Sequence, residues 1–147
     1  KVGAELDWYL LDRAEHSGIK TLLRDLNMLY RDVPALHELD FSHEGFSWVD
    51  CNNADQSVLV YRRIARDGSE VIVALNFTPV PREHYRIGVP KKGGYREIFN
   101  SDSHYYGGSN MGNGFGMYSE DAGCDGMAQS IAITLPPLAG VVLQRMG

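Results

Sequence analysis

Hydrophobic positions along the chain change from helical to strand spacing near residue 41. Before this point, apolar residues recur three and four positions apart between residues 17 and 33. After it, apolar and polar residues alternate in short runs that are separated by turn residues. Helical spacing places a stripe on one helix face, and alternation turns one side of a strand toward a core. The pattern therefore predicts one amphipathic helix followed by an all-β unit.

The predicted helix begins at a Ser17 cap and ends near Arg31 or Asp32, because Pro34 disfavours helical backbone at the residue before it. Its apolar stripe consists of Ile19, Leu22, Leu23, Leu26, Tyr30 and Val33. Met28 falls nearly opposite this stripe. Either Met28 is an incidental surface residue, or the helix is buried on two sides and the second partner is absent. Pro34 also starts a short helical turn.

The run from Val71 to Leu75 is the centre of the predicted β unit. Its unbroken, β-branched composition is typical of a strand buried on both faces. Pro79 and Pro81 cannot donate to a ladder, so regular pairing must stop near Phe77 or move to a sheet edge. Asp67-Gly68 predicts an antiparallel hairpin with the preceding strand. The other predicted strands cover residues 46–50, 58–66, 85–89, 95–99, 130–135 and 140–143. Seven to eight short strands in roughly 100 residues predict an antiparallel β-sandwich.

Two segments have no clear secondary-structure pattern. Near the N-terminal end lies a knot of apolar side chains that needs a cover: Leu6, Trp8, Tyr9, Leu10 and Leu11. Residues 100–129 form a second such segment, with five glycines between positions 107 and 116. A loop this long inside a compact domain is either functional or disordered.

Composition and charge exclude several classes of partner. The 147 residues carry a net charge of -5, so the basic footprint that a nucleic acid requires is absent. No apolar run approaches the roughly 20 residues that span a bilayer. The chain begins without an initiator Met, so we expect a piece of a longer protein. Cys51 and Cys124 do not resemble a disulfide framework, which favours a reducing compartment such as the cytoplasm.

No residue pattern predicts a catalytic, metal or cofactor site. The histidines lack ligand spacing and no Cys-x-x-Cys accompanies them, so we expect no metal. The glycine-rich stretch 107–114 ends in no Lys-Ser/Thr and opens no helix, so we expect no phosphate cradle and no cofactor. The acidic residues lie mainly in predicted turns, and their spacing alone nominates no acid–base pair.

Aromatic side chains offer a weaker indication of ligand binding, because exposed rings stack on sugars and loop amides bond to hydroxyls. Several aromatic residues lie in or near predicted loops: Trp8, Trp48, Tyr105, Tyr106, Phe115 and Tyr118. Trp48 lies in a strand pattern, and we expect it in the core. The candidate substrate-binding residues are Tyr105, Tyr106 and Asn110. The two tyrosines contact either a ligand or another domain.

Several segments along the chain form a distinctive series. They are Asp7-Trp-Tyr-Leu-Leu11, Arg24-Asp-Leu-Asn-Met-Leu-Tyr-Arg31, Pro34-Ala-Leu-His-Glu-Leu-Asp40, Gly45-Phe-Ser-Trp48, Asn76-Phe-Thr-Pro-Val-Pro-Arg82, Tyr85-Arg-Ile-Gly-Val-Pro90, Tyr95-Arg-Glu-Ile-Phe-Asn-Ser-Asp102, Tyr106-Gly-Gly-Ser109 and Thr134-Leu-Pro-Pro-Leu138. In this order they resemble the C-terminal end of bacterial 1,4-α-glucan (glycogen) branching enzymes of the α-amylase superfamily. The resemblance covers essentially the whole chain.

The resemblance implies a domain boundary. Residues 1–40 would be the tail of a catalytic (β/α)₈ barrel, comprising a loop, the last helix and a short helical turn. Residues 41–147 would be the C-terminal all-β domain. Trp8, Leu11 and Met28 would then contact the barrel, and a separated fragment would hide them by self-association or leave its N-terminus mobile.

The resemblance also implies the parent's reaction, which transfers α-1,4-glucan segments to 6-hydroxyls and makes α-1,6 branches. Its paired Asp and Glu would lie upstream, so no residue here is assigned as catalytic and the fragment alone should be inactive. Its role would be to support the barrel. Two alternatives remain: the domain binds α-glucan itself, or the parent is an amylase or a debranching relative.

Overall fold

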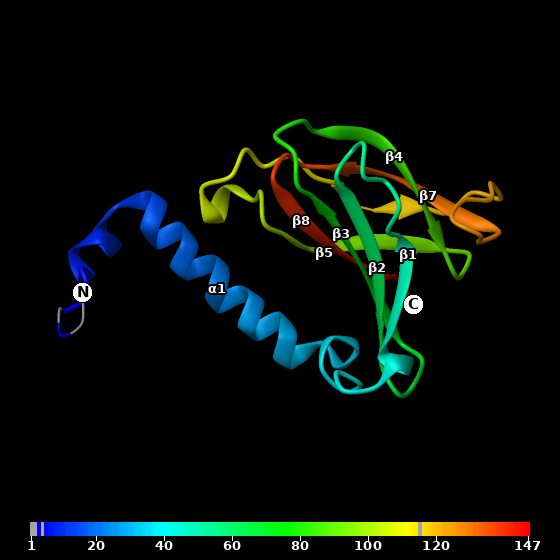
Figure 1. Cartoon of the computed structure of the whole chain (residues 1–147), viewed down its shortest axis with the longest axis horizontal. Helices are drawn as coiled ribbons and strands as arrows, with labels where there is room; N and C mark the ends of the chain where they lie inside the picture. Colours follow the sequence, from blue (N-terminus) through cyan, green and yellow to red (C-terminus); the bar gives the residue numbers. More distant parts are fainter. Residues whose placement is uncertain (1–2, 4, 115) are drawn as a thin grey trace.

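The computed structural model describes residues 3, 5–114 and 116–147. Within these residues a long helix, α1 (Ala14–Asp32), precedes eight strands in two antiparallel sheets (Figure 1). The larger sheet has the order β1 (Phe46–Asp50), β2 (Val58–Ile64), β3 (Glu70–Asn76), β8 (Ala139–Arg145), β5 (Gly94–Asn100) and β6 (Met117–Tyr118). The smaller sheet pairs β4 (Arg82–Val89) with β7 (Gln129–Leu135). The predicted mostly-β sandwich of seven to eight strands after one helix is confirmed.

Strand β3 lies at the centre of the fold, between β2 and β8. Ile72 and Ala74 belong to the core between the two sheets, whereas Val71 and Val73 pack on the opposite face of the larger sheet. All four side chains are buried, so the prediction of a strand covered on both faces is confirmed. The strand ends at Asn76, as the two following prolines predict.

Alternate residues of six strands fill the core between the sheets, because successive side chains of a strand point to opposite faces. The buried residues of this core are Val58, Val60, Ile72, Ala74, Ile87, Val89, Tyr95, Ile131, Ile133, Leu135, Val141 and Leu143. Tyr95 is the bulkiest of them, and its hydroxyl donates to the Lys91 carbonyl oxygen at 2.7 Å. The tyrosine therefore places its aromatic ring in the core without leaving a polar atom unpaired.

The opposite face of the larger sheet is covered by the end of α1 and by a short 3₁₀-helix, η2 (Pro34–Leu36). Ala35 is buried there against valines of β3 and β8. Leu29 and Val33, from the end of α1, pack beside it. Helix η2 begins at Pro34, which confirms the predicted short helical turn.

Helix α1 ends at Asp32 as predicted, but Ser17 is not its cap. The helix begins at Ala14, the N-cap position is Arg13, and the Ser17 hydroxyl donates to the Ala14 carbonyl oxygen inside the first turn. Both residues of this first turn favour a helix. Ala14 has a high helix propensity, and the negative charge of Glu15 lies near the positive end of the helix dipole. Among the described helices, none combines the length and hydropathy that crossing a membrane requires.

Other element boundaries differ modestly from those predicted. β2 ends at Ile64 because the hairpin begins at Ala65, whose N–H donates to the Ser69 carbonyl oxygen at 2.8 Å. β4 begins at Arg82, three residues early, and its register is irregular before Tyr85. The two-residue strand β6 was not predicted, since a pair of residues carries no readable alternation. The N-terminal apolar knot contains a 3₁₀-helix, η1 (Trp8–Asp12).

Asn76 organises the corner at which the chain leaves β3. Its side chain is buried, and its Nδ2 donates to the carbonyl oxygens of Val80 and Pro136, each at 2.9 Å. Its Oδ1 accepts from the Thr78 N–H at 3.0 Å and from the Thr78 hydroxyl at 2.8 Å. The amide thus has a partner for both donors and for its acceptor oxygen, and it joins the proline-rich exit to the turn before β8.

Replacing Asn76 by Asp should lower the free energy of unfolding by about 2–4 kcal/mol, because a carboxylate oxygen would face two carbonyl oxygens where the amide now donates. Urea unfolding measures the change. Asn52→Asp makes the same replacement at an exposed turn residue and should change the free energy by less than about 0.5 kcal/mol. Equal losses at the two sites would contradict this role of Asn76.

Candidate functional site

The apolar stripe of α1 is exposed along much of its length. Ile19 and Leu23 are each 56% exposed, and Tyr30 is 50% exposed. The helix turns a different face toward the β-sandwich, where Gly18 is buried and Leu29 half-buried. Ile19, Leu23 and Tyr30 each follow a buried or half-buried residue by a single position, and one position rotates a helix by about 100°. The N-terminal part of the stripe, Ile19 and Leu23, therefore points to the side of the sandwich, and an exposed patch of this kind indicates an interaction surface.

The N-terminal 3₁₀-helix η1 extends this apolar surface. Trp8 is 66% exposed, and together with Leu11 it lines a hollow of about 590 Å³ between η1 and the stripe residues Ile19 and Leu23. Met28, the third predicted barrel-contact residue, is 46% exposed but does not line this hollow. The structure thus brings together two of the three residues predicted to contact a second domain.

A second hollow, of about 510 Å³, lies between the C-terminal third of α1 and the uncovered part of the larger sheet. Leu26 and Tyr30 line its helix side, while Tyr61, Val73 and Phe99 line its sheet side. The wall is mostly apolar, so the helix leaves a gap above the sheet at this point. No charged residue lines the hollow among the described residues.

The predicted substrate-binding residues lie around a 3₁₀-helix, η4 (His104–Tyr106), in the glycine-rich loop. Tyr106 and Asn110 line a small polar hollow of about 240 Å³. Tyr105 does not line it. Its ring is largely exposed and lies 4.1 Å from the His104 ring, centroid to centroid. The structure thus brings together two of the three predicted residues.

Several polar atoms of this hollow already have partners within the chain. The Asn110 Oδ1 lies 3.2 Å from the Nδ1 of His104. The Tyr106 hydroxyl donates to Asp25 at 3.0 Å, and burial, followed by that hydrogen bond, raises the pKa of Tyr106. Glu97 accepts from the side-chain amide of Asn113 at 2.7 Å. A sugar entering this hollow would therefore compete with hydrogen bonds that the loop makes itself.

The prediction that Trp48 lies in the core is wrong. Trp48 is 50% exposed on β1 and packs edge-on against Phe46, with ring centroids 4.9 Å apart, and against Tyr61. β1 is an edge strand, and the strand's inward residue is Val49 instead. The sequence contained a signal for this, because Phe46 and Trp48 lie two positions apart and share one face of the strand, whereas Val49 lies on the other face. Phe115 lies outside the described residues, and Tyr118 is exposed on β6.

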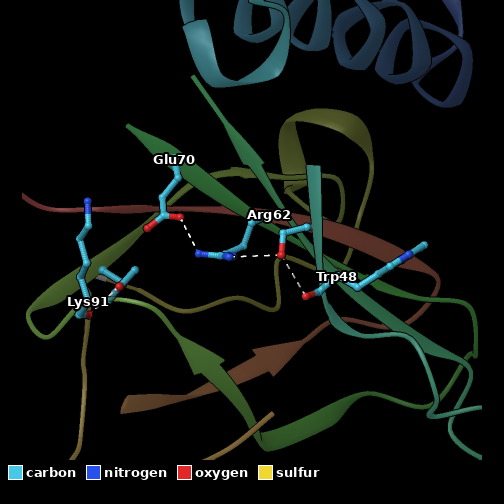
Figure 2. A network of polar contacts seen from close by, with 6 residues as sticks. Trp48, Arg62, Glu70 and Lys91 are labelled. Atoms are coloured by element: carbon cyan, nitrogen blue, oxygen red, sulfur yellow. Dashed lines mark hydrogen bonds and ion pairs between the residues drawn. The ribbon is translucent and has the colours of Figure 1, made fainter. Parts of the chain in front are cut away.

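A mostly buried ion pair lies near this edge. Figure 2 shows Arg62 between Glu70 and the backbone of β1, with the Trp48 side chain pointing away from the pair. The Nη1 of Arg62 donates to Glu70 at 3.0 Å and its Nη2 donates to the Ser47 hydroxyl at 3.2 Å. The two charged side chains are 18% and 10% exposed. Their arrangement joins β1, β2 and β3. The Glu70 carboxylate therefore has a structural role.

The described residues contain no cluster of three or more His, Cys, Asp or Glu side chains that could hold a metal ion. Cys51 and Cys124 are both free. Burial raises the pKa of the Cys124 thiol, which keeps it protonated and unreactive near neutral pH.

Removing Glu70 should be more damaging than removing both members of the ion pair. Glu70→Ala leaves the Arg62 guanidinium mostly buried without its carboxylate, at a cost of about 3 kcal/mol in the free energy of unfolding. The double variant Arg62→Met/Glu70→Leu removes both charges and should regain most of that loss. Chemical denaturation of the two variants tests this, and a double variant less stable than Glu70→Ala would contradict it.

Known proteins resemble this chain over nearly its whole length. Residues 48–146 match the family model described as alpha amylase, C-terminal all-beta domain. A 1,4-alpha-glucan branching enzyme from Nitrosomonas eutropha is 60% identical over 143 residues, which cover 97% of this chain and 20% of that protein. The branching enzymes of Methylobacillus flagellatus and Rhodospirillum rubrum are 58% and 53% identical, over 97% and 98% of this chain and 20% of each relative. The chain thus spans about a fifth of the length of these relatives.

Among solved structures, an alpha-amylase from H.orenii matches this chain with a TM-score of 0.49 and 18% sequence identity. The match covers 84% of this chain and 19% of the amylase chain. A likeness at this level carries no argument about the chain.

Proposed function

The chain belongs to the alpha-amylase C-terminal all-β domain family, and from this premise we propose that it is the C-terminal part of a 1,4-α-glucan branching enzyme. Its own role is to support the catalytic domain of the same parent chain. The parent transfers α-1,4-glucan segments to sugar 6-hydroxyls and so makes α-1,6 branches. The identity of the relatives over nearly the whole chain supports this choice over an amylase or a debranching enzyme.

The observation that carries the supporting role is the exposed apolar stripe of α1. Burying a side chain such as Leu23 or Ile19 is worth about 1.5–3 kcal/mol relative to leaving it in water. Several such side chains lie together on one helix face and continue onto Trp8 of η1. A surface of this size and composition is typical of an interface with another domain.

We place the domain boundary between residues 40 and 41, with α1 belonging to a (β/α)₈ barrel and the sandwich forming the C-terminal domain. In this arrangement Trp8, Leu11 and Met28 contact the barrel. The paired carboxylates of a retaining mechanism, which stand about 5 Å apart, then lie upstream in the barrel. The two free thiols, Cys51 and Cys124, agree with a cytoplasmic location of the parent.

The chain alone should form no α-1,6 linkages from amylose, because it lacks the catalytic carboxylates. Added to a branching enzyme that has been truncated before this segment, it should increase branching, and Leu23→Asp should abolish that increase by placing a charge in the interface. Linkage analysis of the product measures both effects. His43→Asp, a matched change at an exposed residue outside the stripe, serves as the control.

New α-1,6 linkages formed by the chain alone would contradict the assignment of the catalytic residues. Equal effects of the two Asp variants would contradict the docking role of the stripe. Without its partner, the chain should cover the stripe by self-association, which sedimentation of the wild-type chain and of Leu23→Asp would detect as a difference in mass.

A second candidate function is direct binding of α-glucan by exposed aromatic residues. Tyr105 is 71% exposed in the glycine-rich loop, and Trp48 presents half of its surface beside Phe46. Flat exposed rings of this kind suit stacking on sugar faces. Tyr106 and Asn110 remain candidates in the adjoining polar hollow, although the Tyr106 hydroxyl and the Asn110 Oδ1 already have partners.

Native gels that contain glycogen test this second function. Glucan binding predicts that the chain is retarded, that Tyr105→Ala reduces the retardation, and that Tyr9→Ala, a change at a similarly exposed tyrosine outside the loop, does not. Mobility that is independent of glycogen would exclude direct binding and leave the supporting role alone.

A further inference from the structure

Helix α1 is held against the β-sandwich at two separate places. At its C-terminal end, Leu29 and Val33 pack on the sheet, and the Tyr30 hydroxyl donates to Asp40 at 2.5 Å. In its N-terminal half the helix contacts η4, in the loop that Figure 1 draws in yellow beside it. The hollow of about 510 Å³ lies between residues 26–30 of the helix and the sheet. Close packing on the sheet is therefore incomplete over this part of the helix and does not by itself determine the helix angle.

The contact with η4 requires a glycine in the helix. A Cβ atom at Gly18 would lie 2.5 Å from the carbonyl oxygen of Tyr106 and 2.8 Å from its carbonyl carbon. Both are backbone atoms, which cannot swing aside as the end of a flexible side chain can. Glycine is unfavourable in a helix interior, and Gly18 is the buried residue of α1. The close approach of η4 gives a physical reason for its presence.

Two turns further along the same helix face, a hydrogen bond joins the helix to the same tyrosine. The Tyr106 hydroxyl donates to the Oδ2 of Asp25 at 3.0 Å. Asp25 also accepts from Arg24 at 2.8 Å, and these bonds, the one from Arg24 foremost, lower the pKa of Asp25. The Tyr106 ring stacks on Phe99 of β5, with centroids 5.7 Å apart. One residue thus contacts the helix at two points and the sheet at a third.

The loop behind Tyr106 is itself tied together by Asp102. Its carboxylate accepts from the Ser109 N–H at 2.9 Å, from the Ser109 hydroxyl at 2.6 Å and from the Met111 N–H at 3.1 Å. Gly108 packs so closely on Asp102 that a Cβ atom would lie 2.2 Å from its carbonyl oxygen. The glycine-rich segment is therefore a folded support and not a loose connection.

We propose that residues 102–111 act as a latch that sets the angle of α1 on the sandwich, with Tyr106 as its positioning residue and Gly18 and Asp25 as its contacts on the helix. The glycine-rich loop then has a role in presenting the apolar stripe in one orientation. What the stripe binds rests on the proposed function. The latch itself rests on contacts within this chain and is tested in this chain alone.

Spin labels on one helix residue and one sandwich residue give a distance distribution that changes with the angle of the helix. The native Cys51 is exposed beside β1, and Met28→Cys supplies a second site on α1, in a Cys124→Ser background. The latch predicts a narrow distance distribution that Tyr106→Phe and Gly18→Ala each broaden or shift. His16→Ala, an exposed change in the same helix away from η4, should leave the distribution as it was. Unchanged distributions in both latch variants would overturn the proposal.

Hydrogen exchange separates the latch from simple helix propensity. Removing a hydrogen bond to a carboxylate should make amides in the N-terminal half of α1 exchange about tenfold faster in Tyr106→Phe, with β3 amides unchanged as a check on the fold. Ala is a better helix former than Gly, so without a latch Gly18→Ala would slow exchange in α1. The latch predicts faster exchange in this variant, and slower exchange would contradict it.

Discussion

The fold depends on one strand being covered on both faces. β3 buries Ile72 and Ala74 between the sheets and Val71 and Val73 beneath η2 and the end of α1. A strand of this kind needs a layer on each side, so the smaller sheet and the helical segment are both required. Asn76 then ends the strand and turns the chain toward β4 while bonding to the segment before β8. The helix is therefore part of the same packing as the sandwich, even if it also belongs to another domain.

Local pattern was sufficient for much of this fold. The apolar run of β3, the Asp67-Gly68 hairpin and the prolines after Asn76 act over a few residues, and each predicted element appears. Local pattern failed where the outcome depends on distant neighbours. Trp48 lies in a strand pattern, but alternation does not say which face of β1 is buried, and the position of β1 at the edge of the sheet depends on the assembled fold. Ser17 has the chemistry of a cap, but the chain upstream already continues the helix.

In the candidate site, too, local pattern predicted some features, and others depend on residues far apart in the sequence. Helical spacing identified the apolar stripe, whereas the resemblance assigned Trp8, Leu11 and Met28 to a contact with the barrel. Spacing could not reveal which face of the helix the sandwich contacts, because the contacts come from distant residues such as Tyr106, which lies 81 residues after Asp25 in the chain. The exposed Ile19 and Leu23 and the buried Gly18 are consequences of one geometry, in which the sandwich contacts the helix face that carries Gly18 and leaves the N-terminal part of the stripe exposed.

The most direct measurement of this account is hydroxyl-radical footprinting of α1, in the isolated chain at a dilution where sedimentation shows a monomer, and in the longer parent protein. If the stripe is an interface with the catalytic domain, Leu23 and Ile19 should be oxidised several-fold more slowly in the parent, while Tyr118, exposed on β6, reacts equally in both and serves as the internal reference. Equal oxidation of the stripe residues in the two proteins would contradict the account.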